Sequence, residues 1–183
     1  MRSAFLSCLL AAFVAAHPVA AQYAQQPVSP QTTVSNEDFR RLALIAESFD
    51  YESSRLALTQ SSRHSIRRYA ASLMSHYRFD YARLAAGAGI FSGIPALPAD
   101  PNMAPAPVSD TRRAAMLNQL ATVTGRAFDR LYADMQVGTR QETLGLYQAY
   151  VQSGGDPALV TFARERIPFL QQQYRAARRF TGR

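Results

Sequence analysis

Apolar residues recur every three or four positions along most of the chain, and this spacing predicts amphipathic helices. The first stretch follows Ser35, a capping residue with acidic neighbours, and continues to Gln60. Ser61 and Ser62 are expected to cap a second helix, whose apolar stripe reaches Leu84. A pair of glycines soon afterwards is typical of a helix end.

The C-terminal half repeats this pattern. A short helix is expected from residue 109 or 110 to about 120, and residues 122–125 interrupt the pattern before a long helix. Gly154-Gly155 ends that helix, and Asp156-Pro157 predicts the start of the last one, because Asp caps well and Pro suits the first helical position. No stretch alternates with period two, so no sheet is expected.

These elements predict an all-α protein with four long antiparallel helices, arranged as an up-down bundle, and one short additional helix. Residues 90–108 contain five prolines, which are incompatible with a helix interior. This segment is therefore interpreted as a long crossover connection between the second and third helices of the bundle.

The N-terminus predicts export. Arg2 precedes an uncharged apolar run, and small residues lead up to Ala21, where signal peptidase is expected to cleave. Residues 1–21 are interpreted as a signal peptide, 22–34 as a disordered leader rich in Gln, Pro, Ser and Thr, and 35–183 as the bundle domain. The expected location is the periplasm. Cleavage would remove Cys8, the only cysteine, and no later apolar run is long enough to cross a membrane.

The charge is strongly basic and unevenly distributed. All 20 basic residues are Arg, and the net charge of +7 becomes +6 after the predicted cleavage. Two-thirds of that surplus belongs to the last helix, where Arg175, Arg178 and Arg179 form a predicted surface patch. Export excludes nucleic acid as a partner, so the patch favours an anionic envelope polymer, or another envelope protein, as the partner.

Few polar residues fall near the inner stripes. They are Glu52, His76, Asp80, Glu142, Arg166 and Gln173. A metal centre built from Glu52, His76, Asp80 and Glu142 is one hypothesis, but the Glu-x-x-His spacing of di-metal bundles is absent. The favoured alternative is a structural polar layer of Asp80, Glu142 and Arg166, in which Asp80 pairs with His76 and Glu142 pairs with Arg166. No cofactor is expected.

Several segments resemble a bacterial family of exported proteins, the domain-of-unknown-function family 4142, which is assigned to the ferritin-like bundles. The matching segments are Arg55-Leu56-Ala57-Leu58, Phe128-Asp129-Arg130-Leu131-Tyr132, Gly155-Asp156-Pro157 and Ile167-Pro168-Phe169-Leu170. The resemblance implies an exported helical bundle without an assigned activity. Where the family commonly has three histidines, this chain has Tyr77, Arg140 and Gln173.

The sequence therefore favours a non-enzymatic periplasmic bundle that acts through its surface, as an envelope-interaction or structural protein. The alternative is a ferritin-like metal-binding protein or oxidoreductase with a degenerate site. The oligomeric state is not predicted.

Overall fold

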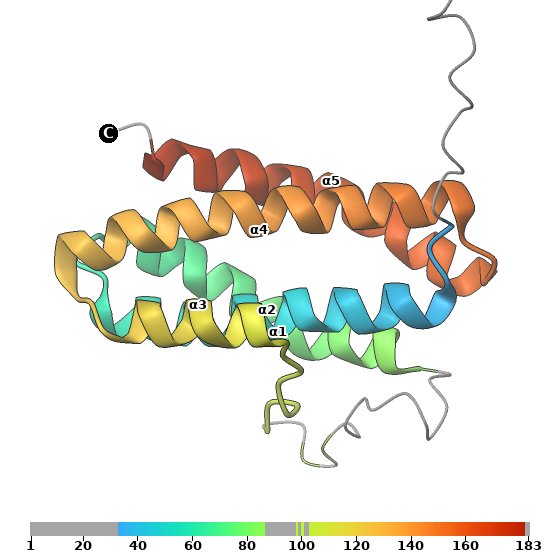
Figure 1. Cartoon of the computed structure of the whole chain (residues 1–183), viewed down its shortest axis with the longest axis horizontal. Coiled ribbons are helices and arrows are strands. Elements are labelled where there is room, and N and C mark those ends of the chain that lie inside the picture. Colours follow the sequence, from blue (N-terminus) through green and yellow to red (C-terminus); the bar gives the residue numbers. More distant parts are fainter. Residues whose placement is uncertain (1–32, 87–97, 99, 101–102, 182–183) are drawn as a thin grey trace, which may run out of the picture. The chain divides into compact units, whose positions relative to one another are not determined.

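The computed structural model describes residues 33–86, 98, 100 and 103–181. Across this part of the chain the secondary structure is entirely helical, which confirms the predicted all-α class (Figure 1). The helices are α1 (Asn36–Gln60), α2 (His64–Ala85), α3 (Thr111–Ala121), α4 (Gly125–Ser153) and α5 (Pro157–Thr181).

Polar side chains cap three of these helices. The Ser35 hydroxyl accepts a hydrogen bond from the Asp38 N–H at 3.0 Å, and the Asp110 carboxylate accepts one from the Arg113 N–H at 2.7 Å. Asp156 does the same for the first turn of α5. These bonds satisfy backbone donors that have no partner inside the helix.

The cap predicted for α2 is wrong. The N-cap residue of α2 is Arg63, which makes no side-chain capping bond. The hydroxyl groups of Ser61 and Ser62 instead donate to the carboxylate of Asp129 on α4, at 2.5 and 2.6 Å. These charge-assisted hydrogen bonds tie the α1–α2 turn to α4, and the Ser61 hydroxyl also accepts a hydrogen bond from the Arg63 N–H at 3.1 Å.

Two glycine-containing turns separate the last three helices, as predicted. α3 ends at Ala121, and α4 begins at Gly125, whose φ of 59° lies in the left-handed region that favours glycine. α4 ends at Ser153, and α5 begins at Pro157 after three intervening residues. α5 continues through Pro168 to Thr181.

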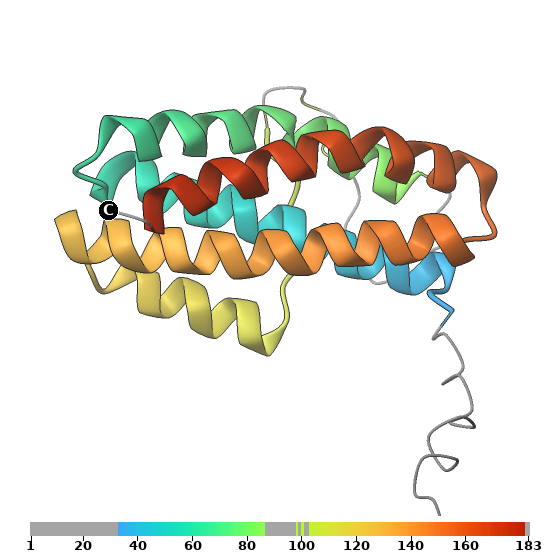
Figure 2. The ribbon, with the colours of Figure 1, turned by 90° about the horizontal axis from the view of Figure 1, so that it is seen from above.

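The first helix is the most enclosed. α1 packs against α2, α3 and α4, while α5 lies along α4 and also touches α2 (Figure 2). Eight consecutive residues of α1, Ala43 to Asp50, are buried as a result. Along this stretch α1 has neighbours on several sides and no solvent-facing stripe, so its polar residues are buried along with the apolar ones.

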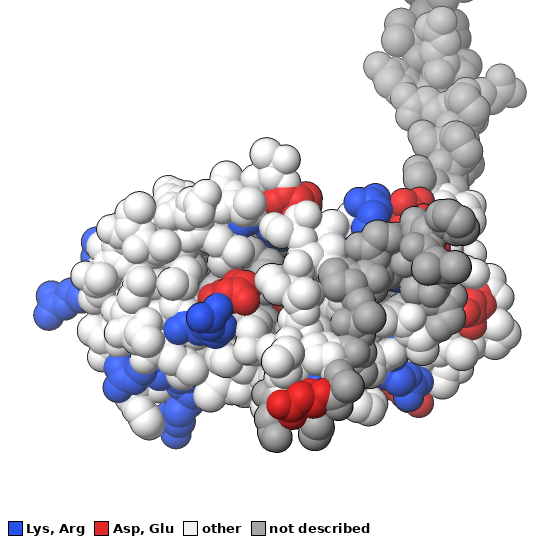
Figure 3. All heavy atoms as spheres, turned by 90° about the horizontal axis from the view of Figure 1, so that it is seen from below, with Lys and Arg blue, Asp and Glu red and all other residues white. Residues whose placement is uncertain are grey.

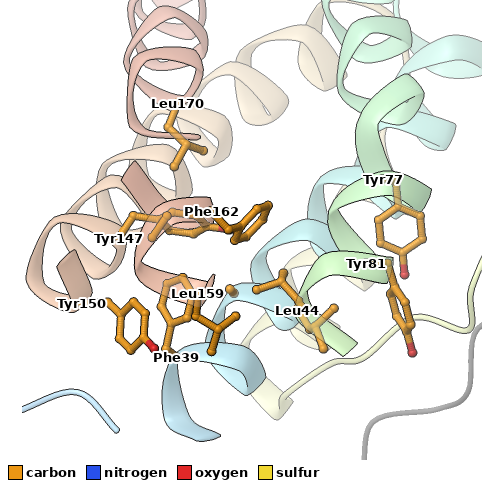
Figure 4. Close-up of a cluster of buried hydrophobic side chains, with 12 residues drawn as sticks. Phe39, Leu44, Tyr77, Tyr81, Tyr147, Tyr150, Leu159, Phe162 and Leu170 are labelled. Atoms are coloured by element: carbon orange, nitrogen blue, oxygen red, sulfur yellow. The ribbon is translucent and has the colours of Figure 1, made fainter. Parts of the chain in front are cut away.

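Two apolar clusters fill the bundle. The larger one combines the first half of α1 with the second halves of α2 and α4 and with α5, and it includes Phe39 stacked on Tyr150 at a centroid distance of 3.9 Å (Figure 4). The smaller one lies towards the other end of the bundle and includes Ile66, Phe128 and Tyr132. The aromatic side chains that recur at helical spacing thus belong to the hydrophobic core of the bundle.

Some predicted segments fall outside the described residues. These are the signal peptide at 1–21, the leader at 22–34 apart from its last two residues, and much of the proline-rich segment. Its described end contacts the bundle, because the Val108 N–H donates to the Ser48 hydroxyl at 2.9 Å. None of the helices present in the structure is both long enough and apolar enough to span a membrane.

Candidate functional site: a buried ion-pair layer

Charged and polar side chains fill the interior between the two apolar clusters. Along α1 the polar stretch from Glu47 to Ser54 separates Leu44 of one cluster from Ala57 of the other. Along α4 a stretch from Gln136 to Thr143 does the same. Because burying charge is costly without a partner, the pairing of these groups decides what the layer can do.

The first pair joins α1 to α4. The Arg140 guanidinium lies against the Asp50 carboxylate, and the two side chains are only 1% and 4% exposed. Arg140 is among the largest fully buried side chains in the described part of the chain. The Asp50 carboxylate holds the pKa of Arg140 above its ordinary value despite the opposing effect of burial. This arginine therefore stays charged inside the bundle.

The second pair joins α2 to α5. An Arg166 nitrogen lies 2.5 Å from a carboxylate oxygen of Asp80, which is completely buried. The Arg166 guanidinium also lies over the Phe169 ring, 4.2 Å from its centroid. A flat guanidinium can stack on an aromatic ring and bind a carboxylate at once, which suits arginine to this position better than lysine.

A further carboxyl group lies near both pairs. Glu47 is 5% exposed, and its Oε1 atom has no hydrogen-bond partner among the described residues. Burial raises the pKa of Asp80 to about 8 and that of Asp50 to about 7, and the neighbouring Glu47 contributes to both shifts. Burial and the nearby Glu47 charge thus favour retention of a proton by Asp50 and Asp80, although each is paired with a guanidinium.

Uncharged side chains complete the layer. The Gln136 amide donates to the Ser53 hydroxyl at 3.0 Å, and the Tyr69 hydroxyl donates to the Gln136 carbonyl oxygen at 3.4 Å. The hydroxyls of Ser54 and Tyr132 lie 3.3 Å apart. These bonds connect α1, α2 and α4 and supply partners for polar groups that are removed from water.

Of the predicted layer, the structure brings Asp80 and Arg166 together. Asp80 pairs with Arg166 and not with His76, whose ring lies beside Phe169 at a centroid distance of 4.5 Å. The His76 Nδ1 atom lies 3.0 Å from the Ser72 carbonyl oxygen. The helix crossing therefore gives Asp80 a stronger and permanently charged partner from α5.

The expected pairing of Glu142 with Arg166 is corrected. The Glu142 side chain is 44% exposed and binds Arg112 and Arg113 of α3, at 2.6 and 3.0 Å. These arginines lower the pKa of Glu142, mainly through the hydrogen bond from Arg112. α3 lies beside α4, so its arginines reach Glu142 on the outside of the bundle.

The four residues of the metal hypothesis do not converge. Glu52 pairs with Arg55 on its own helix at 2.8 Å, Glu142 binds α3, and Asp80 binds α5. Within the described ranges, no group of three His, Cys, Asp or Glu side chains could hold a metal ion. The interior carboxylates Asp50 and Asp80 belong instead to the ion-pair layer, where each is paired with a guanidinium group.

The predicted basic patch lies on the surface. Arg175, Arg178 and Arg179 are all exposed on the last turns of α5, and the Arg178 guanidinium lies over the Tyr174 ring at 5.8 Å. Basic groups at this end of a helix also interact favourably with its dipole.

Sequence reasoning missed three members of the interior network. Asp50 and Glu47 lie off the apolar stripe of α1, and Arg140 was considered only as a departure from the family pattern. It also missed Arg40, which donates to the carbonyl oxygens of Leu84 and Ala86 and pairs with Asp156 at 3.1 Å. The complete absence of lysine gave no signal about which arginines are buried.

Comparisons with known proteins identify a family. The match is to the domain of unknown function DUF4142, and it covers residues 19–180. Neither the curated proteins nor the solved structures contain a significant match. The match spans all five helices, including the ion-pair layer and the Phe128–Tyr132 segment. The chain therefore belongs to the DUF4142 family.

Proposed function

We propose that this protein is an exported, non-catalytic helical bundle that acts in the cell envelope by binding through its surface. Its arrangement would be that of a ferritin-like, four-helix up-down bundle, with α3 as the additional short helix. The observation that carries the proposal is the pairing of Arg140 with Asp50 and of Arg166 with Asp80. Two interior carboxylates are thereby committed to guanidinium partners.

The chemistry of arginine supports this view. A guanidinium group has N–H donors and no free lone pair, so it cannot ligate a metal ion. It also repels a cation that approaches the carboxylate to which it is paired. In bundle metal sites the carboxylates and imidazoles of facing helices converge on the metal, whereas here α4 and α5 contribute arginine.

Metal analysis tests the non-catalytic assignment against a ferritin-like metal protein or oxidoreductase. The purified protein is dialysed against Fe²⁺, Mn²⁺ or Zn²⁺, and its metal content and melting temperature are measured with and without a chelator. We expect substoichiometric metal and an unchanged melting temperature. Stoichiometric metal that disappears in Asp80→Ala or Glu142→Ala would overturn the proposal. Asp134→Ala, an exposed change on α4, is the control.

Export requires its own experiment. The N-terminal features support cleavage after Ala21, so the protein produced in a bacterial host should be recovered from the periplasm with Gln22 as its first residue. Leu10→Arg places a charge in the apolar run and should leave the uncleaved chain in the cytoplasm. An intact Met1 on protein from the wild-type gene would contradict export.

A further inference from the structure

A basic pocket lies at the end of the bundle where the α1–α2 turn meets the start of α4. It has a volume of about 390 Å³ and is lined by Ser62, Arg63, Arg126, Asp129 and Arg130. Figures 1 and 2 show that the α1–α2 turn, the α3–α4 turn and the end of α5 share this end of the molecule. None of the residues that line the pocket belongs to the ion-pair layer.

The arginines of this pocket have no acidic partner in the described structure. Asp129 is the acidic residue in the pocket lining. Its side chain is buried, with the residue 4% exposed, and it accepts hydrogen bonds from Ser61 and Ser62. Neither Arg126 nor Arg130 forms an ion pair with any residue that the structure describes, and both are exposed. Their charges are therefore available to a ligand.

Arg63 connects the pocket to the basic patch of α5. Its guanidinium lies over the Phe180 ring at 5.5 Å, and Phe180 directly follows Arg178 and Arg179. At the extreme left edge of Figure 3 the visible charged side chains are basic, whereas both signs occur further to the right. Arg63 therefore belongs to the pocket lining and also contacts the C-terminal turn of α5.

The backbone adds to the positive electrostatic potential of the pocket. α2 and α4 both begin at this pocket, and their N-cap residues, Arg63 and Thr124, make no side-chain capping bond. The other helix starts in the described chain are capped by Ser35, Asp110 and Asp156. Unsatisfied N–H groups at a helix start favour an anion, and here they supplement three arginines.

We propose that this pocket binds a phosphate monoester carried by a sugar or a lipid. Three guanidiniums and the Asp129 carboxylate give a formal charge of +2, which matches the dianionic form of a phosphate monoester better than a single carboxylate. Arginine binds phosphate through paired hydrogen bonds, and the pocket has room for the group attached to the phosphate. The inference rests on the proposed surface-binding function and names its ligand class and site.

The test uses the purified protein and two probes that carry a phosphate monoester. Glucose 1-phosphate is the soluble probe, and phosphatidylcholine vesicles that contain phosphatidic acid are the lipid probe. Calorimetry gives the affinity for the sugar phosphate, and co-sedimentation gives the affinity for vesicles. Binding of the sugar phosphate alone assigns a soluble ligand, and binding of the vesicles alone assigns a lipid source.

The decisive variant is Arg126→Ser/Arg130→Ser, and its charge-matched control is Arg41→Ser/Arg164→Ser in the other half of the bundle. All four arginines are exposed, so both variants should fold. We expect the pocket variant to weaken binding about tenfold or more, because it removes two of the three cations, and the control to bind like the wild type. Equal weakening in both variants would overturn the pocket and leave surface binding in place. If the wild type binds neither probe, the proposal of a phosphate site in this pocket is also overturned. The metal analysis tests the proposed function separately.

Discussion

The Arg140 guanidinium on α4 lies against the Asp50 carboxylate on α1 deep inside the bundle, with 1% and 4% of the two side chains exposed. Neither Asp50 Oδ1 nor Arg140 Nη1 has a hydrogen-bond partner among the described residues. The attraction between the two groups offsets a large cost of desolvation. A pair of this kind specifies which helix faces meet, so we interpret the layer as a structural feature of the bundle.

Glu142→Gln should have a small effect on stability, because the Glu142 side chain is 44% exposed and water screens its interaction with α3. We expect the free energy of unfolding in urea to fall by about 1 kcal/mol or less. Asp80→Asn is the comparison, measured above pH 8 where Asp80 is ionised, since it then leaves the Arg166 charge without its buried partner and should cost more. Equal effects of the two changes would place Glu142 in the interior network.

The unfolding free energy should fall as the pH rises from about 5 to about 8. The pKa values of Asp80 and Asp50 are raised by burial to about 8 and about 7, whereas the unfolded chain releases these protons near pH 4. Folding therefore takes up protons in this window, and each of the two groups lowers the stability by up to about 1.4 kcal/mol per pH unit until its pKa in the folded protein is reached. Asp38 and Glu142, whose pKa values are lowered by hydrogen bonds, are ionised throughout it.

Glu47→Gln provides the control for this pH dependence. Removal of the Glu47 charge relieves its repulsion of Asp50 and Asp80, so urea unfolding across the same pH range should show a shallower fall. An exposed change, Glu165→Gln, should leave the slope unchanged. A wild-type stability that rises with pH over this range would refute the assignment.

Asp129→Ala should destabilise the bundle by about 1–3 kcal/mol, because two charge-assisted hydrogen bonds are lost, a buried one from Ser61 and a partly buried one from Ser62. Asp134→Ala removes an exposed carboxylate from the same helix and should have little effect. Thermal unfolding measures both. Similar melting temperatures of the two variants would show that Asp129 does not hold the α1–α2 turn.

Gly154→Ala should destabilise the protein, whereas Gly155→Ala should not. A Cβ atom at Gly154 would lie 2.6 Å from the Tyr150 carbonyl oxygen and 2.8 Å from its ring, and a backbone oxygen cannot move aside cheaply. A Cβ atom at Gly155 would meet nothing within 4 Å. The difference in melting temperature between the two variants checks this, and equal values would contradict it.

Local signals in the sequence were sufficient to predict where the last two helices end and begin. Asp156-Pro157 marks the start of α5, and Gly154 ends α4 where a side chain would collide with Tyr150. These features depend on neighbours within a few residues, so the sequence contains them directly.

The interior network depends on how the helices are placed, and this limited its prediction. Periodicity assigned a single buried face to α1, but three helices cover it, so Glu47 and Asp50 are buried while Leu42 is 37% exposed. Glu142 was placed inside because the position of α3 beside α4 cannot be read from its own residues. Asp80 and Arg166 were found because α2 and α5 do present one face inward.

A double-mutant cycle on Asp50 and Arg140 tests the structural role of the layer most directly. Urea unfolding is measured above pH 8, where Asp50 is ionised, for the wild type, Asp50→Asn, Arg140→Met and the double variant. Arg140→Met alone should cost about 3–5 kcal/mol, because it leaves a buried carboxylate unpaired. The double variant should be more stable than the sum of the single effects predicts, by about 2 kcal/mol or more. Additive effects of the two substitutions would contradict the pairing.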